Sequence, residues 1–482
     1  MSTQTAENTQ NPTPPANNEL PPGRLEKFFE LKANGTTART EFMAGLTTFF
    51  ATAFTILAIP TMIGGDNMSL RSAVFIAATL SAAAGTLMKA FFAKLPFVQA
   101  PGMGIGSYFA GTVMPAMAVL IGNPDLSRVE QYQMGLVLVL IAGVLFWLTS
   151  FWGIRQRIVA GIPHNIKIAL GSGIGLFITF LGLRQSGLVV GSPGTFVTLV
   201  NFSEWTPVAH GAVLSAAGLL LIAVLAARKI KGAILIGIVA TAIAAYVTGH
   251  TAMPESLSLN PAEQFSYFGE YSFFRLNFGA LFDGGVTGAI VGTLIGMVLV
   301  FTLVNMLDAI GTISGIARAA GMVDEKGEAK NLHKALSADA AGTVVSGLFG
   351  TSSTTTVVSS ASGIGEGGRT GLTSATTGVL FIAALFLAPF VGLIPMVATA
   401  PALIFVGCLM MANIKDVDFK DLTEAIPAFL TIAMMPLSFS IANGIAFGLI
   451  SYIIIKALTG RWRQVSPVSL VIAALFVLQF VL

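Results

Sequence analysis

Two stretches of this chain decide its fold: Gln99-Ala-Pro-Gly-Met-Gly-Ile-Gly-Ser-Tyr108 and Gly350-Thr-Ser-Ser-Thr-Thr-Thr-Val-Val-Ser-Ser-Ala-Ser-Gly363. The first places a proline and three glycines within eight residues, a combination that breaks helices. In the second, nine of the twelve residues 351–362 are Ser or Thr. Neither stretch suits a helix that faces lipid, because hydroxyl and backbone groups at membrane depth must be buried in protein or line a cavity.

The surrounding chain has the composition of a membrane protein. Of its 482 residues, 54% are hydrophobic and 10% are charged, whereas a soluble domain carries about a quarter charged residues. The 26 Lys and Arg residues nearly balance the 23 Asp and Glu residues, which argues against nucleic-acid binding. The single cysteine excludes a disulfide framework and a thiolate metal cluster. The expected partners are therefore membrane lipid and a small molecule.

Apolar stretches recur from residue 42 onward, each close to the ~20 residues that cross ~30 Å of hydrocarbon. Residues 466–482 are also apolar, and a surface helix, a re-entrant piece or a further span all remain open for them. The pattern predicts an all-α polytopic membrane protein with about fourteen transmembrane segments, near residues 43–63, 70–92, 104–122, 133–152, 166–184, 207–227, 230–249, 286–312, 334–349, 357–366, 371–394, 399–413, 423–439 and 442–458.

The start of the chain and the basic residues predict its orientation. Residues 1–23 contain five prolines and no Lys or Arg, which predicts a disordered cytosolic tail. Residues 24–41 predict an amphipathic surface helix. With alternating spans, 22 of the 26 basic residues, Lys89 among them, fall on the cytosolic side, as the positive-inside rule requires. We therefore expect a bacterial inner (plasma) membrane protein with cytoplasmic N- and C-termini, leaving outside only Arg71, Arg128, Arg184 and Arg275.

The two interrupted stretches occupy equivalent places in two halves of the chain. One belongs to the third of the first seven spans, and the other to the third of the second seven. Equivalent broken segments indicate repeats with a binding site at the middle of the membrane, between half-helices. Because seven is odd, the two halves must have opposite orientations. The alternative is that the glycines only let helices pack closely.

One carboxylate lies deep within an apolar run. A charge at the bilayer centre costs about 2.5 to 3.5 kcal/mol, so Asp308 requires a cavity, a partner or a proton. Asn305, Asp308 and Thr312 are spaced to share one helical face. We expect Asp308 to couple proton entry to substrate binding; the alternative is a structural cap on a neighbouring half-helix. Asp339 lies nearer a span end and is predicted to be structural.

The chain offers no pattern for metal or hydrolytic chemistry. Its four histidines are scattered at the ends of spans, without a His/Asp/Glu cluster or a Ser/His pairing. We therefore expect no catalytic residues, no metal site, no cofactor other than a proton as coupling ion, and no enzyme activity. The histidines are His164, His210, His250 and His333.

Several motifs together resemble one transporter family. In this order along the chain, they are similar to those of the adenine/guanine/hypoxanthine permeases, the AzgA-like branch of the nucleobase:cation symporter-2 (xanthine/uracil permease) family. The likeness runs from about Leu25 to about Arg461. The motifs are Gln99-Ala-Pro-Gly-Met-Gly104, Val304 to Thr312, Gly350-Thr-Ser352, Gly367-Gly-Arg-Thr-Gly-Leu372, Ala400-Pro-Ala-Leu403 and Asp421-Leu-Thr-Glu-Ala-Ile-Pro-Ala-Phe429.

The resemblance implies an architecture. It implies 7+7 inverted repeats, with short β-strands preceding the half-helices of spans 3 and 10 and meeting at the substrate site. Members of this fold are commonly dimers, so a homodimer is a candidate assembly. Spans 1–4 and 8–11 would form a core domain (42–152 and 286–398). Spans 5–7 and 12–14 would form a gate domain (153–285 and 399–482, including the apolar C-terminal segment).

The resemblance also implies site residues, and the chain departs from the family pattern at three of them. The acidic residue of the FDTxGT pattern matches Asp308, but Asn305 replaces an Asp, Ser359 replaces a substrate-binding Glu, and Gly106 replaces an Asn. A flat base could stack on aromatic rings and bond to hydroxyls. The predicted substrate-binding residues are Phe49, Gly104, Gly106, Ser107, Tyr108, Asn305, Asp308, Ser359 and Ser360.

Together these features predict a proton-coupled symporter that imports a purine nucleobase such as adenine, guanine or hypoxanthine by alternating access. Because a buried site discriminates strongly by its hydrogen bonds, the three departures leave a different heterocycle or a small organic anion as alternatives. A channel or a membrane receptor ranks lower, because no continuous polar stripe runs through several spans.

Overall fold

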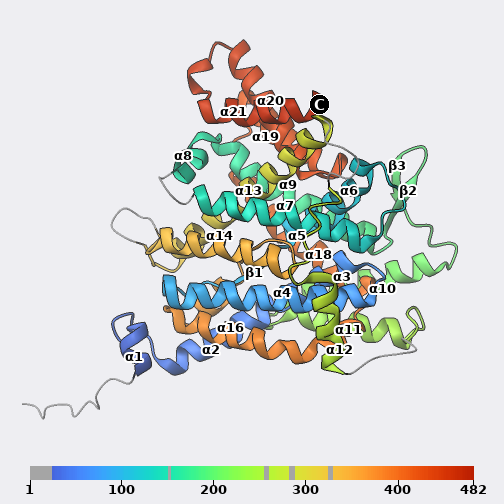
Figure 1. Cartoon of the computed structure of the whole chain (residues 1–482), viewed down its shortest axis with the longest axis vertical. Helices are drawn as coiled ribbons and strands as arrows, with labels where there is room; N and C mark the ends of the chain where they lie inside the picture. Colours follow the sequence, from blue (N-terminus) through green and yellow to red (C-terminus); the bar gives the residue numbers. More distant parts are fainter. Residues whose placement is uncertain (1–23, 150–153, 254–259, 282–287, 324–328, 482) are drawn as a thin grey trace, which may run out of the picture.

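The computed structural model describes residues 24–149, 154–253, 260–281, 288–323 and 329–481. Long helices stacked side by side make up most of the molecule (Figure 1). The predicted disordered tail, residues 1–23, lies outside the described residues.

The first half of the chain supplies seven membrane segments at the predicted places. A break at Ala53 and Phe54 divides the first segment, and the third begins with a strand and a short helix. The segments are α2 (Ala38–Thr52) with α3 (Thr55–Gly64); α4 (Met68–Met88) with the π-helical η1 (Lys89–Ala93); β1 (Gln99–Pro101), α5 (Met103–Tyr108), the π-helical η2 (Phe109–Val113) and α6 (Met114–Ile121); α7 (Arg128–Thr149); α9 (His164–Gln185); α10 (Pro207–Ala227); and α11 (Ala233–Val247).

The second half repeats this succession. Its first segment is one long helix, and its third again joins a three-residue strand to a short helix. The segments are α13 (Gly288–Ala319); α14 (Leu332–Phe349); β4 (Thr354–Thr356) with α15 (Ser360–Gly365); α16 (Gly371–Ala384) with η4 (Leu385–Leu387) and α17 (Ala388–Val391); α18 (Met396–Met411) with η5 (Ala412–Asp416); α19 (Leu422–Leu437); and α20 (Ile441–Leu458).

The predicted number of segments agrees with helix length and hydropathy. Among the described residues, ten helices are long and apolar enough to cross a membrane. The other four predicted segments are short or carry charge: α11, α14, α15 and α19.

Helix packing shows the relation between the halves. β1 pairs with β4, α4 packs on α14, and α9 packs on α18, so each of these elements meets its own counterpart. The fourth segment of each half packs on the first two segments of the other half: α7 lies on α13 and α14, while α16 lies on α2 and α4. Likewise α9 packs on α19, and α18 packs on α10. The molecule is therefore a 7+7 inverted repeat about an axis through the β1–β4 ribbon.

Helix starts are fixed by local sequence. Asn67 accepts a hydrogen bond from Leu70 N at 2.9 Å and caps α4. Thr206, Thr370 and Ser440 cap α10, α16 and α20 in the same way. Such caps satisfy backbone donors that a helix leaves open.

The predicted surface helix over residues 24–41 is wrong in extent. The structure has a helix only at α1 (Arg24–Phe29), and Thr37 then caps the separate α2. The cause is Asn34-Gly35, a turn signal, with Gly35 at φ +67°. A helix over 24–41 would have to run straight through this turn.

Several connecting elements were not predicted from the sequence. A hairpin of β2 (Val189–Ser192) and β3 (Phe196–Leu199) follows α9, and α12 (Pro261–Tyr267) with η3 (Phe268–Ser272) precedes α13. The short α8 (Ile154–Gly161) precedes α9. The undecided C-terminal stretch forms α21 (Pro467–Val481), which packs on α13, α20 and α8.

Candidate functional site

A short ribbon organises the centre of the molecule. β1 pairs antiparallel with β4, with Gln99 opposite Thr356 and Pro101 opposite Thr354. α5 begins after Pro101 and α15 begins after Thr356, so the two short helices leave the ribbon at opposite ends. Figure 1 shows β1 deep among the long helices. The predicted strands before both half-helices are confirmed.

The ribbon is tied to α13 by hydrogen bonds. Ser353 Oγ donates to Asn305 Oδ1 at 2.8 Å, and Gly102 N donates to Ser353 O at 3.2 Å. Asn305 is thus held beside the start of α5, and its Nδ2 has no hydrogen-bond partner among the described residues. An amide donor fixed at this point is available to a ligand.

Unpartnered buried polar atoms gather around the same ribbon. Within the described ranges, hydroxyls of this kind occur on both sides: Ser107 and Tyr108 on α5, and Thr351, Ser352 and Thr355 at or just before β4. Most buried polar groups in proteins are hydrogen-bonded, so such a concentration requires an explanation. A polar ligand that enters here would satisfy them.

Gly106 brings α5 close to its neighbours. A Cβ placed there would collide with Ile59 Cδ1 of α3 and lie 3.2 Å from Ser352 Oγ. The family's Asn would not fit at Gly106 unless Ile59 moved, so the hydroxyl of Ser352 is the polar group that reaches this point. Gly104 likewise permits close contact with Ile174 of α9, because a Cβ at position 104 would lie 2.5 Å from Ile174 Cγ2.

An aromatic wall lies next to these hydroxyls. The rings of Tyr108 and Phe301 are 5.3 Å apart and meet edge to face. Phe301 lies one turn before Asn305 on α13, so ring and amide share a helical face. Phe301 is not among the residues predicted from the sequence, although its spacing from Asn305 could have identified it.

Asp308 continues the same face. Its side chain is half-buried and within hydrogen-bonding range of Thr312, and it is close enough to Asp339 for the two carboxyl groups to interact electrostatically. None of the described Lys or Arg residues forms an ion pair with it. A carboxyl group in this position can carry a proton without disturbing an existing ion pair.

Asp339, by contrast, is fully paired. Lys89 Nζ lies 3.0 Å from Asp339 Oδ2, and both side chains have 0% exposure. Thr356 Oγ1 donates to the same carboxylate at 2.9 Å, and Lys89 Nζ also donates to Ala335 O at 2.7 Å. This agrees with the structural role predicted for Asp339. Lys89, which the positive-inside count places on the cytosolic side, is not a surface residue, because η1 turns its side chain inward against α14.

The other predicted site residues lie as follows. Phe49 packs on Phe381 of α16, with ring centroids 5.5 Å apart, rather than on Tyr108. Ser360 Oγ accepts a hydrogen bond from Val98 N at 3.0 Å and so holds the start of β1. Ser359 is half-buried in the turn before α15. The structure therefore groups Gly106, Ser107, Tyr108, Asn305 and Asp308, and adds Phe301, Thr351, Ser352 and Thr355.

The residues added on the β4 side could not be chosen from sequence. Residues 351–356 are all Ser or Thr, and which hydroxyls are already bonded depends on partners elsewhere in the chain. The hydroxyl of Ser353 is hydrogen-bonded to that of Thr343 on α14, and the hydroxyl of Thr354 to that of Ser346 on the same helix. The hydroxyls of Ser352 and Thr355 have no hydrogen-bond partner within the described residues.

The chain is similar to known permeases over nearly its whole length. A model described as a permease family matches residues 39–447. A putative permease of Methanocaldococcus jannaschii is 40% identical, covering 95% of this chain and 98% of the relative. The adenine permease AdeP of Escherichia coli is 38% identical (95% and 96%), and the guanine/hypoxanthine permease PbuO of Bacillus subtilis is 37% identical (94% and 99%).

Solved structures share the fold at low sequence identity. The transmembrane domain of a cyanobacterial bicarbonate transporter, BicA, superposes with a TM-score of 0.58 at 16% identity, covering 84% of this chain and 97% of that chain. SLC26A9 gives a TM-score of 0.60 at 11% identity, covering 87% and 65%. At these identities the likeness shows the fold alone.

Proposed function

Because the chain belongs to this permease family and is an integral membrane protein, we propose that it imports a purine nucleobase by proton-coupled symport. Its relatives include proteins named as adenine and guanine/hypoxanthine permeases. The observation that carries the proposal is the group of unpartnered polar atoms where β1 and β4 meet, beside the ring of Tyr108 and the carboxyl group of Asp308.

The arrangement suits a flat, polar molecule. A purine carries donors and acceptors on its edges and an aromatic face on each side. The edges would bond to Ser107, Ser352 and the Asn305 amide, while Tyr108 and Phe301 provide ring contacts. Desolvating these groups costs free energy unless the ligand replaces their hydrogen bonds, which gives the site its selectivity.

We assign the proton to Asp308. A carboxyl group inside the membrane without an ion pair is most stable when protonated. If the proton binds together with the base, the carboxyl group of Asp308 is neutral whenever the site is occupied. The movement of the proton is then coupled to the movement of the base. We propose no cofactor other than the proton, because the base would be bound by hydrogen bonds and ring contacts alone.

Alternating access would arise from two groups of helices. α2–α7 and α13–α16 pack mainly with one another, as do α9–α11 and α18–α20. We propose that these groups act as the core and gate domains expected from the family, and that one moves against the other while the ribbon stays with the core. The protein would reside in the bacterial inner membrane with the N-terminus and most basic loops in the cytosol, alone or as a homodimer.

Uptake assays test the function. Cells or proteoliposomes that contain the full chain are given labelled adenine, guanine, hypoxanthine, xanthine or uracil, with and without an uncoupler. We expect saturable purine uptake that the uncoupler abolishes. Uptake that is indifferent to the uncoupler would contradict coupling, and competition by organic anions but not by purines would favour the anion alternative.

A further inference from the structure

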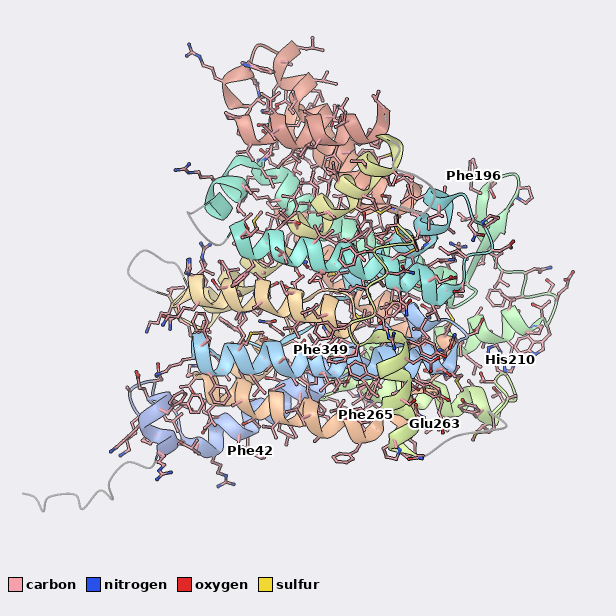
Figure 2. The ribbon with its side chains drawn as sticks, in the orientation of Figure 1. Phe42, Phe196, His210, Glu263, Phe265 and Phe349 are labelled. Carbon is pink, nitrogen blue, oxygen red and sulfur yellow. The ribbon has the colours of Figure 1, made fainter. Side chains whose placement is uncertain are left out.

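A cavity of about 570 Å³ lies away from the central ribbon. It is bordered by the α3–α4 connection, the end of α9, the start of α10, the residues after α11 and the segment before α18. His210, whose ring lies 5.2 Å from that of His250 in its wall, is at the end of the molecule that carries the β2–β3 hairpin (Figure 2). The volume is in the range of small-molecule sites.

The walls come from both groups of helices. Asp66 and Arg71 belong to the group of α3 and α4, whereas Arg184, Gln185 and His250 belong to the group of α9–α11. Movement of one group of helices against the other would therefore change the shape of the cavity. Under the positive-inside assignment, Arg71 and Arg184 place it on the outer side, where an imported molecule arrives.

Most polar groups in the wall are already bound to the protein. Arg71 donates to Gly65 O and to Ile394 O, the latter at 3.2 Å. Tyr246 OH donates to Leu393 O at 2.9 Å, and Gln185 Nε2 donates to Thr399 Oγ1 at 3.3 Å. These bonds hold the walls in place.

Besides the exposed Asp66 carboxylate, whose Oδ1 lies 4.0 Å from an Arg71 nitrogen, two nitrogen-bearing groups of the wall remain available. The Arg184 guanidinium lies over the Phe439 ring, 5.2 Å from its centroid, and forms no ion pair with any described residue. His250 Nδ1 is buried without a hydrogen-bond partner within the described ranges. Burial and the neighbouring His210 lower the pKa of His250, so its imidazole is neutral at neutral pH. Gly211 makes room for this ring, because a Cβ there would lie 2.9 Å from His250 Cε1.

We propose that this cavity is a second ligand site, which takes a 6-oxopurine such as hypoxanthine before it reaches the ribbon. A guanidinium donates two parallel hydrogen bonds to the adjacent O6 and N7 acceptors of an oxopurine. Adenine presents an amino donor in place of O6 and can accept only one of them. His250 Nδ1 supplies the further polar contact. This inference depends on the proposed function, because it assigns an additional site for the same class of cargo.

Equilibrium binding tests the site. The full chain in lipid nanodiscs is titrated with labelled hypoxanthine, alongside Arg184→Gln and the control Arg275→Gln, an exposed arginine outside the cavity wall. We expect two sites per chain in the wild type and in Arg275→Gln. In Arg184→Gln the affinity of one site for hypoxanthine should fall by about tenfold or more. Adenine should fill only the other site, at the ribbon. Uptake by Arg184→Gln should show a raised KM with an unchanged maximal rate.

Other results would overturn the proposal in distinct ways. One site per chain in all three proteins, with normal purine uptake, contradicts the second site and leaves the transport function intact. Displacement of hypoxanthine from the Arg184-dependent site by acetate or inorganic phosphate would make it an anion site instead. Failure of every variant to bind or transport any nucleobase would remove the proposed function together with this inference.

Discussion

Two carboxylates on consecutive helices, Asp308 on α13 and Asp339 on α14, lie in very different surroundings. The Asp339 carboxylate is completely buried, forms an ion pair with Lys89 and accepts a hydrogen bond from the Thr356 hydroxyl. The Asp308 carboxyl group is within hydrogen-bonding range of Thr312 and is partly exposed, and it forms no ion pair among the described residues. A buried charge that is fully paired stabilises one arrangement of the chain, whereas a carboxyl group without a cation is free to exchange a proton. Pairing, rather than membrane depth, distinguishes the acid with a predicted structural role from the acid to which we assign the proton.

The largest effect should follow from breaking the paired acid. Asp339→Ala leaves the Lys89 ammonium buried without a counter-charge, which typically costs about 3–5 kcal/mol. We expect a large loss of folded protein, measured as thermal stability in detergent. The double variant Lys89→Met/Asp339→Leu should recover most of it, because replacing both members of a buried pair is often neutral. A single variant that melts like the wild type would show that the pair is dispensable.

The unpaired acid should give the opposite result. Asp308→Asn keeps the shape and removes the proton site, so thermal stability should stay close to that of the wild type. Accumulation of purine against a gradient should fall between about 5- and 150-fold, the usual range of a coupling free energy, and the residual uptake should be insensitive to an uncoupler. Uncoupler-sensitive accumulation by Asp308→Asn would assign the proton to another group.

Smaller effects should come from the hydroxyls around the ribbon. Ser352→Ala removes one hydrogen-bonding group from the proposed base site, worth about 0.5–1.5 kcal/mol, and should raise the KM for uptake roughly 2- to 12-fold. The matched control is Ser81→Ala, which removes another buried, unpartnered hydroxyl, from α4. Equal changes in KM for both variants would contradict a ligand contact at Ser352.

The smallest effect concerns a titratable group outside the membrane segments. Because the pKa of His250 is lowered in the folded protein, the unfolded chain binds the proton more readily. The wild type should therefore lose stability as the pH falls below about 6.5. Replacing the imidazole in His250→Gln should remove this part of the loss and raise the melting temperature by about 2 °C or less at pH 5.5, with no change at pH 8.

His164→Gln, at the start of α9, is the matched control for a general effect of losing a histidine. A melting temperature of His250→Gln that follows the wild type at every pH would contradict a lowered pKa at this position.

The sequence by itself determined the number and order of the membrane segments, because ~20 apolar residues are required to cross the hydrocarbon wherever they lie in the chain. It also placed the two broken segments, since Pro, Gly and runs of Ser or Thr disfavour a lipid-facing helix locally. Asp308 was identifiable for the same reason, as an isolated charge in an apolar run. Asn34-Gly35 carried a local turn signal that the prediction of one surface helix overlooked.

Only the tertiary structure decided which polar groups are satisfied. Lys89 and Asp339 are 250 residues apart, and Ser353 is bonded while Ser352 is free, although both belong to one run of hydroxyl residues. Hydrogen bonds and ion pairs act over about 3 Å, so their partners depend on how distant segments fold back onto one another. Local sequence patterns cannot specify those distances, which determine which polar groups are already hydrogen-bonded and which remain open to a ligand.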